Sequence, residues 1–189
     1  MTRKLIKSGE RTCRQADIFR NYRDLREKVD RICREIEAEF GPHLACHDGC
    51  DGCCRHLSLF PIEAAALAAA LDSLPGKEAE RIRDRARGAS SGSSCPLLED
   101  GHCLLYSARP IICRTHGLPL ITLQKGIRSI DFCPLNFRGI SSLPGKAVID
   151  LDRLNTTLAA INALFVAERH GIAPPKERIT IAEALTYEG

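Results

Sequence analysis

The chain has 189 residues, of which 44% are hydrophobic and 27% charged, proportions typical of a soluble globular protein. Its formal net charge of +3 is too small to indicate nucleic-acid binding by itself. The apolar runs fall short of the ~20 residues that a bilayer span requires, and the basic start lacks the apolar stretch of a signal peptide. We therefore expect a cytoplasmic protein without a membrane partner.

The first predicted element is a long helix over residues 14–40, where apolar side chains recur every third or fourth residue and form one stripe. Cys33 lies on that stripe, so we expect it in the core, because a buried free cysteine behaves as a small hydrophobic residue. Cys13 precedes the helix and is not assigned as a ligand. Residues 1–42 form the first predicted unit.

The second predicted unit, residues 43–136, begins with an irregular loop over 43–57. Two helices follow within 61–87, and the glycine- and serine-rich stretch 88–94 is predicted to be a flexible linker. This linker separates four cysteines from four later ones. The two groups must therefore meet in space if they bind a common centre.

The remaining elements are short until the final helices. The sequence predicts a tight turn at Asp100-Gly101, followed by further elements at 104–106 (strand), 110–114 (one helical turn), 121–132 (β-hairpin), 152–170 (long helix) and 179–187 (short helix). Residues 137–189 are expected to pack on the rest as one globular unit. The predicted fold is mainly α, with helices packed around a small irregular and β metal-binding region.

Ten cysteines make up about 5% of the residues, below the ~8–10% of a small disulfide scaffold. In a reducing compartment, clustered cysteines indicate metal ligands or redox groups. Four occur within nine residues, in the run Cys46-His-Asp-Gly-Cys50-Asp-Gly-Cys53-Cys54. Thiolates select zinc, copper(I) or iron–sulfur clusters over hard ions. The loop therefore predicts a site for a soft metal.

Four more cysteines occur in Cys95-Pro-Leu, Gly101-His-Cys103, Arg109-Pro-Ile-Ile-Cys113-Arg and Cys133-Pro. In this order the motifs resemble the YkgJ-type CxxCxxCC cysteine-cluster family, over about residues 43–136. The resemblance implies a zinc- or iron-chelating domain whose metal ligands are Cys46, Cys50, Cys53, Cys54, Cys95, Cys103, Cys113 and Cys133. One departure is the spacing of three residues between Cys46 and Cys50, where the family name implies two; structural zinc sites tolerate either spacing.

The grouping of these ligands stays open at this point. Eight thiolates can form two closed four-thiolate zinc sites, one four-cysteine cluster with one zinc ion, or a bridged pair of ions. In an extended backbone the side chains of Cys53 and Cys54 point in opposite directions, which favours different metals for them. Five histidines lie near the cysteines in sequence and are expected to support ligands or lie at the surface: His43, His47, His56, His102 and His116.

The favoured function is a metal-binding protein that holds zinc or iron, in chelation or structural stabilisation. The alternatives are an iron–sulfur redox or group-transfer enzyme, and a zinc-dependent module that binds nucleic acid or protein. The triplet Cys46-x3-Cys50-x2-Cys53 also matches that of radical SAM enzymes, but the chain lacks their repeated strand–helix units. No phosphate-binding glycine loop or Ser-His-Asp order is found, so no catalytic residue is assigned. Few aromatic residues accompany the basic first helix, which argues against nucleic acid; a protein partner stays open.

Overall fold

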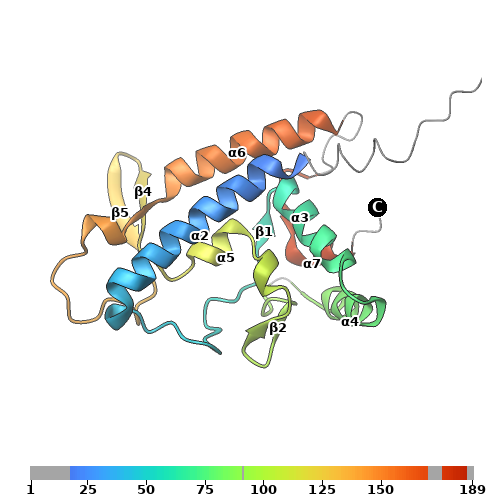
Figure 1. Cartoon of the computed structure of the whole chain (residues 1–189), viewed down its shortest axis with the longest axis horizontal. Helices are drawn as coiled ribbons and strands as arrows, with labels where there is room; N and C mark the ends of the chain where they lie inside the picture. Colours follow the sequence, from blue (N-terminus) through green and yellow to red (C-terminus); the bar gives the residue numbers. More distant parts are fainter. Residues whose placement is uncertain (1–17, 91, 170–175, 187–189) are drawn as a thin grey trace, which may run out of the picture.

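The computed structural model describes residues 18–90, 92–169 and 176–186 (Figure 1). Within these ranges the chain is mainly helical, with short strands in small sheets, as the sequence predicts. No helix in the described ranges is both long and apolar enough to cross a bilayer. The helices form two neighbouring hydrophobic cores, and the cysteine-bearing segments lie along one side of them.

The first core lies between α2 (Arg20–Phe40) and α6 (Leu151–Glu168), which runs back alongside α2 in Figure 1. The Phe19 ring, just before α2, stacks on Phe165 near the end of α6 with a centroid separation of 6.0 Å. The predicted stripe of α2 is buried, Cys33 included. At its end the chain continues as a single 3-10 turn, η1 (Gly41–His43). Residues 14–17 and 170, predicted at the ends of these helices, lie outside the described ranges.

The second core is built by α3 (Pro61–Asp72), α4 (Gly76–Arg87) and α7 (Ile181–Thr186). The predicted helix 179–187 starts later than expected. Residues 179–180 form strand β7 (Ile179–Thr180), which pairs antiparallel with β1 (Ser58–Leu59). The pairing holds these two residues extended, so the helix begins only at Ile181. Tyr187 lies outside the described ranges.

Both hairpins turn where the sequence predicts. β4 (Leu120–Gln124) pairs with β5 (Ile127–Asp131), and β6 (Ile149–Asp150) adds to β4 in parallel. β2 (Leu98–Glu99) pairs with β3 (His102–Cys103) around Asp100-Gly101. Both turn residues have positive φ, 48° and 79°, as this tight hairpin turn requires.

The predicted strand over 104–106 is wrong. The turn at Asp100-Gly101 sets the register, which pairs Glu99 with His102 and Leu98 with Cys103. One further hydrogen bond joins Leu104 N to Leu97 O, and a 3-10 turn, η2 (Tyr106–Ala108), then begins. The strand therefore contains Cys103 itself. The next element, α5 (Ile111–Thr115), is the predicted helical turn and carries Cys113.

Candidate metal centre

The eight predicted ligands lie in five separate segments of the chain. The first four lie in the irregular loop between η1 and β1, and the others lie just before β2, in β3, in α5 and after β5. Figure 1 shows this loop and the β2–β3 hairpin on the same side of the molecule, beneath α2 and α5. Every cysteine in the described ranges is a free thiol. Cys13 lies outside those ranges.

Backbone contacts join the cysteine loop to the second cysteine segment. The N–H of Cys95 donates to the carbonyl of Cys54 at 3.3 Å, and Arg55 forms an isolated antiparallel bridge with Ser94. A Cβ placed on Gly101 would lie 3.1 Å from the carbonyl oxygen of Gly49, so the β2–β3 turn touches the loop directly. The two groups of cysteines are therefore adjacent in space, although residues 88–94 lie between them in the sequence.

Four thiols lie within electrostatic reach of one another. Burial raises the pKa of Cys113 to about 12, and the charges of Cys95, Cys103 and Cys54 add to that rise. Burial likewise raises the pKa of Cys95 to about 11, with further contributions from Cys103 and Cys54. Cys54, Cys95 and Cys103 thus act on Cys113 as like charges would. Cys54, Cys95, Cys103 and Cys113 form one neighbourhood.

Cys53 has different neighbours. Burial raises the pKa of its thiol, followed by the charges of Cys54, Cys50 and Cys46. The pKa of Cys54 is also raised, first by burial, then by the charges of Cys103, Asp51 and Cys50. Cys54 therefore borders both groups, whereas Cys53 faces the loop cysteines.

The expected opposition of the Cys53 and Cys54 side chains assumed an extended backbone, which the chain does not have at Cys53. The backbone here is not extended, because the N–H of Cys54 bonds to the carbonyl of Asp51 at 2.8 Å and closes a turn. The side chain of Cys53 lowers the pKa of the Cys54 thiol, against the larger effect of burial. The opposition of the two side chains therefore stays a prediction.

Cys46 and Cys133 meet around Gly117. A Cβ on Gly117 would lie 3.4 Å from Sγ of Cys46 and 3.6 Å from Cβ of Cys133, and the residue has a positive φ of 89°. Glycine is the residue that adopts this backbone readily and leaves room for a sulfur atom. The N–H of Cys133 also bonds to the Gly117 carbonyl at 3.2 Å. The segment after β5 is thereby fixed beside the start of the cysteine loop.

Asn136 supports this contact, and the sequence analysis did not identify it. Its side chain is buried, with 1% exposed. The amide nitrogen Nδ2 donates to the Gly117 carbonyl at 2.7 Å and lies 3.5 Å from Sγ of Cys46, while Oδ1 accepts from Ala45 N at 2.8 Å. The only local signal in the sequence was an amide three residues after a predicted ligand. Its partners lie far away along the chain and could not be read from spacing.

One comparison with known proteins finds a family model that matches this part of the chain. Residues 45–134 match the model of the CxxCxxCC family, described as "Putative zinc- or iron-chelating domain". We refer to residues 45–134 below as the CxxCxxCC domain, after the family model that they match. The match begins at the residue whose N–H bonds to Asn136 and ends one residue after the last predicted ligand. A search of curated proteins and a search of solved structures each find no match to the chain.

Several histidines near the CxxCxxCC domain already have protein partners. His102 bonds through Nδ1 to the carbonyl of Asp100 at 2.8 Å and through Nε2 to Asp48 at 3.2 Å, and these contacts raise its pKa, the Asp100 bond most. His56 contacts the Ser90 carbonyl and the Ala182 N–H, each at 3.2 Å. Both ring nitrogens of His56 and His102 are thus engaged. His43 stacks on Phe137, and burial lowers the pKa of His116.

Two arginines flank Cys113 in the CxxCxxCC domain, and they have different roles. The charge of Arg109 lowers the pKa of both Cys103 and Cys113, against the larger effect of burial. Arg114 instead forms an ion pair with Asp30 of α2 at 2.6 Å and bonds to the carbonyls of Arg109 and Ser107. Arg109 therefore offsets thiolate charge, and Arg114 ties α5 to α2.

A buried carboxylate fixes the start of α5. Glu63, with 2% of its surface exposed, accepts the N–H of Ile111 at 3.0 Å and that of Phe60 at 3.2 Å. Burial raises the pKa of Glu63. Because Ile111 begins α5, this carboxylate sets the position of Cys113 two residues later.

The donor chemistry of the CxxCxxCC domain fits zinc or iron. The eight predicted ligands are free thiols, and sulfur donors select these metals over hard ions. In the part of the chain that the structure describes, no group of three or more Cys, His, Asp or Glu side chains is already arranged as a metal-ligand set. Coordination therefore requires the thiols to lose their protons and turn toward a shared ion.

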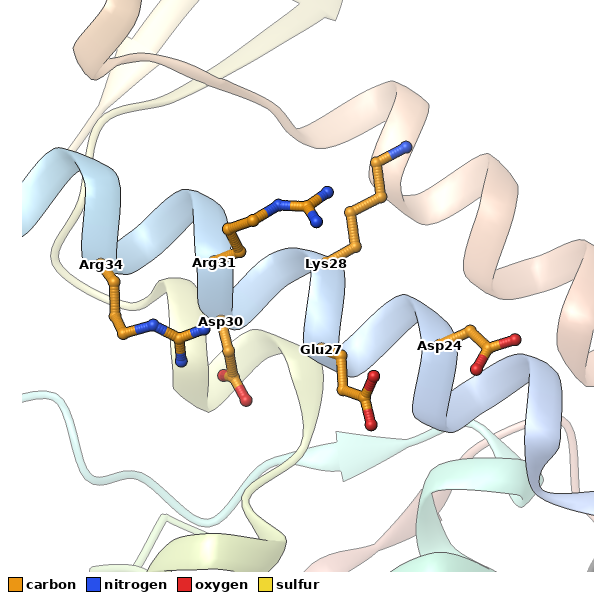
Figure 2. A pocket seen from close by; sticks show the side chains of 6 residues that line it. All are labelled: Asp24, Glu27, Lys28, Asp30, Arg31 and Arg34. Atoms are coloured by element: carbon orange, nitrogen blue, oxygen red, sulfur yellow. The ribbon is translucent and has the colours of Figure 1, made fainter.

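A separate hollow lies on the exposed side of α2 (Figure 2). It is lined only by charged residues: Asp24, Glu27, Lys28, Asp30, Arg31 and Arg34. Figure 2 shows these side chains diverging from the helix rather than pointing toward one centre. Asp30 is paired with Arg114. This hollow has neither the converging carboxylates of a metal site nor a surface of a single sign.

Proposed function

We propose that this protein binds zinc or iron through eight cysteine thiolates and that the metal holds the CxxCxxCC domain together. The ligands are Cys46, Cys50, Cys53, Cys54, Cys95, Cys103, Cys113 and Cys133. The observation that carries the proposal is the meeting of two cysteine segments, shown by the bond from Cys95 N to Cys54 O. Free thiols drawn together from distant positions are the donor set that zinc and iron prefer.

The metal's role would be structural or storage-related. The segments that carry the thiols are loops, a two-residue strand and a five-residue helix, so little regular secondary structure holds them in place. Zinc would supply a cross-link without redox chemistry, whereas iron would add one-electron transfer. The proposal also places the protein in the cytoplasm, where a reducing environment keeps thiols available as ligands.

Metal analysis of protein purified without oxygen tests this function, together with an absorption spectrum. A colourless protein that contains zinc, or a coloured one that contains iron, supports the proposal; iron accompanied by sulfide identifies a cluster. Cys50→Ala and Cys113→Ala should each reduce the metal content, while Cys33→Ala should leave it unchanged. A folded wild-type protein with neither metal would contradict the proposed function.

A further inference from the structure

We propose that metal binding at the cysteines is coupled to the docking of residues 176–186, which we call the C-terminal segment. This segment lies outside the CxxCxxCC domain. The coupling passes through residues 54–59, which we call the connector. The bound ion holds the connector in place, and the connector holds the C-terminal segment on the protein. This inference rests on the proposed function and goes beyond it by naming a part of the chain that the metal controls.

One end of the connector is joined to the second cysteine segment. The carbonyl of Cys54 accepts the N–H of Cys95 at 3.3 Å, and the next residue, Arg55, forms its antiparallel bridge with Ser94. Cys54 and Cys95 are both proposed ligands. An ion that binds cysteines from both segments therefore keeps this end of the connector against its partner.

His56, in the middle of the connector, contacts both sides. Its Nε2 accepts the N–H of Ala182 at 3.2 Å, so Nδ1 carries the proton of the neutral ring and donates to the Ser90 carbonyl, also at 3.2 Å. Ser90 lies in the stretch before Cys95, and Ala182 lies in α7. One side chain thus spans the chain that leads to the later cysteines and the C-terminal segment.

The other end of the connector is paired with the C-terminal segment. The carbonyl of Leu57 accepts the N–H of Ile181 at 2.9 Å. Strand β1 then pairs with β7, with Ser58 opposite Thr180. An isolated two-stranded sheet is marginally stable at best in water. Each of these strands therefore depends on what else holds it, and for β1 that includes the cysteine loop directly before it.

A hydrophobic core provides a second link. α7 packs against α3 and α4 (Figure 1) and contributes Ile181 and Leu185 to the second core, each with 1% of its surface exposed. Cys95 and Cys103 pack against the same core as partly buried side chains. Displacement of these two ligands therefore disturbs the core that holds α7, and release of α7 uncovers the core beside them.

The ion adds a restraint that the loop before the connector lacks. Between η1 and β1 the described chain forms neither a helix nor a named strand, so regular secondary structure does not fix the position of the connector from this side. Metal–thiolate bonds at Cys53 and Cys54 do so. Because linked binding equilibria affect each other equally, docking of the C-terminal segment raises the affinity for metal by the same factor as metal strengthens docking.

Hydrogen exchange of the full chain, measured by mass spectrometry, tests the coupling. Peptides from residues 176–186 are compared between protein freed of metal with a chelator and a reductant and protein loaded with Zn²⁺. We expect zinc to slow their exchange by about 5–150-fold, the usual range of coupling between two sites. Residues 151–168 of α6, which pack in the first core, are the internal reference and should slow less.

A matched pair of surface arginines tests the reciprocal effect. The Arg178 guanidinium lies 3.7 Å from the centre of the Phe60 ring and attaches the C-terminal segment to the start of α3. Arg169 makes the same kind of contact with Phe165, at 4.9 Å, at the end of α6. Arg178→Ala should speed exchange in the C-terminal segment and weaken zinc binding in a competition titration, whereas Arg169→Ala should do neither.

The outcomes separate this coupling from the proposed function. Exchange in residues 176–186 that zinc leaves unchanged, or slows no more than in α6, would overturn the coupling while leaving metal binding intact. So would a zinc affinity that is unchanged in Arg178→Ala or falls equally in Arg169→Ala. A wild-type chain that binds neither zinc nor iron would instead refute the proposed function. Because the exchange comparison uses wild-type protein, its result does not depend on a variant that folds.

Discussion

The amide nitrogen of Asn136 lies 3.5 Å from the sulfur of Cys46, across a separation of 90 residues. The same side chain bonds to Ala45 and Gly117. Asn136 lies just beyond the matched segment of residues 45–134, yet it joins the beginning of that segment to its end. Groups of this kind orient ligands and tune the charge on sulfur. The position of Asn136 therefore holds Cys46 beside Gly117, the residue that Cys133 also contacts.

Asn136→Ala should weaken the proposed zinc binding by about 10–100-fold, because it removes the group that orients Cys46. A competition titration against a chelator of known affinity measures the change. Asn162→Ala is the matched control. It also removes a side-chain amide that accepts a backbone N–H, that of Ile62 in α3, and this hydrogen bond involves no cysteine segment. Equal zinc affinities for the two variants would show that Asn136 has no special role at the metal.

Gly117→Ala and Gly139→Ala separate backbone strain from crowding. Both glycines have positive φ, 89° and 81°, so each substitution should cost about 1–2 kcal/mol of folding free energy. Only the Gly117 Cβ would contact Cys46 and Cys133, because nothing lies within 4 Å of the Cβ position at Gly139. Urea unfolding should give similar losses for both. Zinc release from the loaded protein should change in Gly117→Ala alone, and identical release from both variants would contradict a role for this contact in metal binding.

Glu63→Gln should destabilise the fold by about 1–3 kcal/mol, the cost of leaving a buried donor unpaired. Both carboxylate oxygens of Glu63 accept backbone N–H groups, and glutamine replaces one of them with an amide that cannot accept. Urea denaturation monitored by circular dichroism measures the loss. Glu35→Gln, at an exposed position of α2, should stay within about 0.5 kcal/mol of wild type. A neutral result at Glu63 would mean that another group satisfies Ile111 N.

Stability should depend on pH through Glu183. Its carboxylate pairs with Lys176 and accepts the N–H and hydroxyl of Thr180, and these contacts, the Lys176 bond most, lower its pKa to about 2. An unfolded glutamate titrates near ~4.3. The stabilisation is therefore fully present above the unfolded pKa and is lost as pH falls through the folded one.

The measurement for Glu183 is the difference in unfolding free energy between wild type and Glu183→Gln. This difference should be constant above about pH 5 and shrink between pH ~4.3 and ~2. Contributions common to both proteins, including metal release, cancel in it. Glu177→Gln, an exposed carboxylate of the same segment, should give a flat difference. A Glu183 difference that grows as the pH falls would reverse the predicted sign.

The sequence by itself determined the helices, the hairpin turns and the chemical class of the ligands. The apolar period of residues 18–40 is a local pattern, and so is the need for positive φ at Asp100-Gly101 and Lys125-Gly126. A run of four cysteines within nine residues indicates a soft metal whatever surrounds it. Short elements were harder, because two-residue strands such as β3 and β7 are set by their pairing partners rather than by their own residues.

Only the tertiary structure decided which cysteines are neighbours. The expectation for Cys53 and Cys54 assumed an extended backbone, but a turn closed by the Asp51 carbonyl forms there instead. Cys54 meets Cys95 through one backbone bond, and Cys46 meets Cys133 through the space at Gly117. Asn136 acts on residues about 90 positions away. Such contacts depend on how separate elements pack. The spacing of residues along the chain does not indicate which of them will lie close together in space.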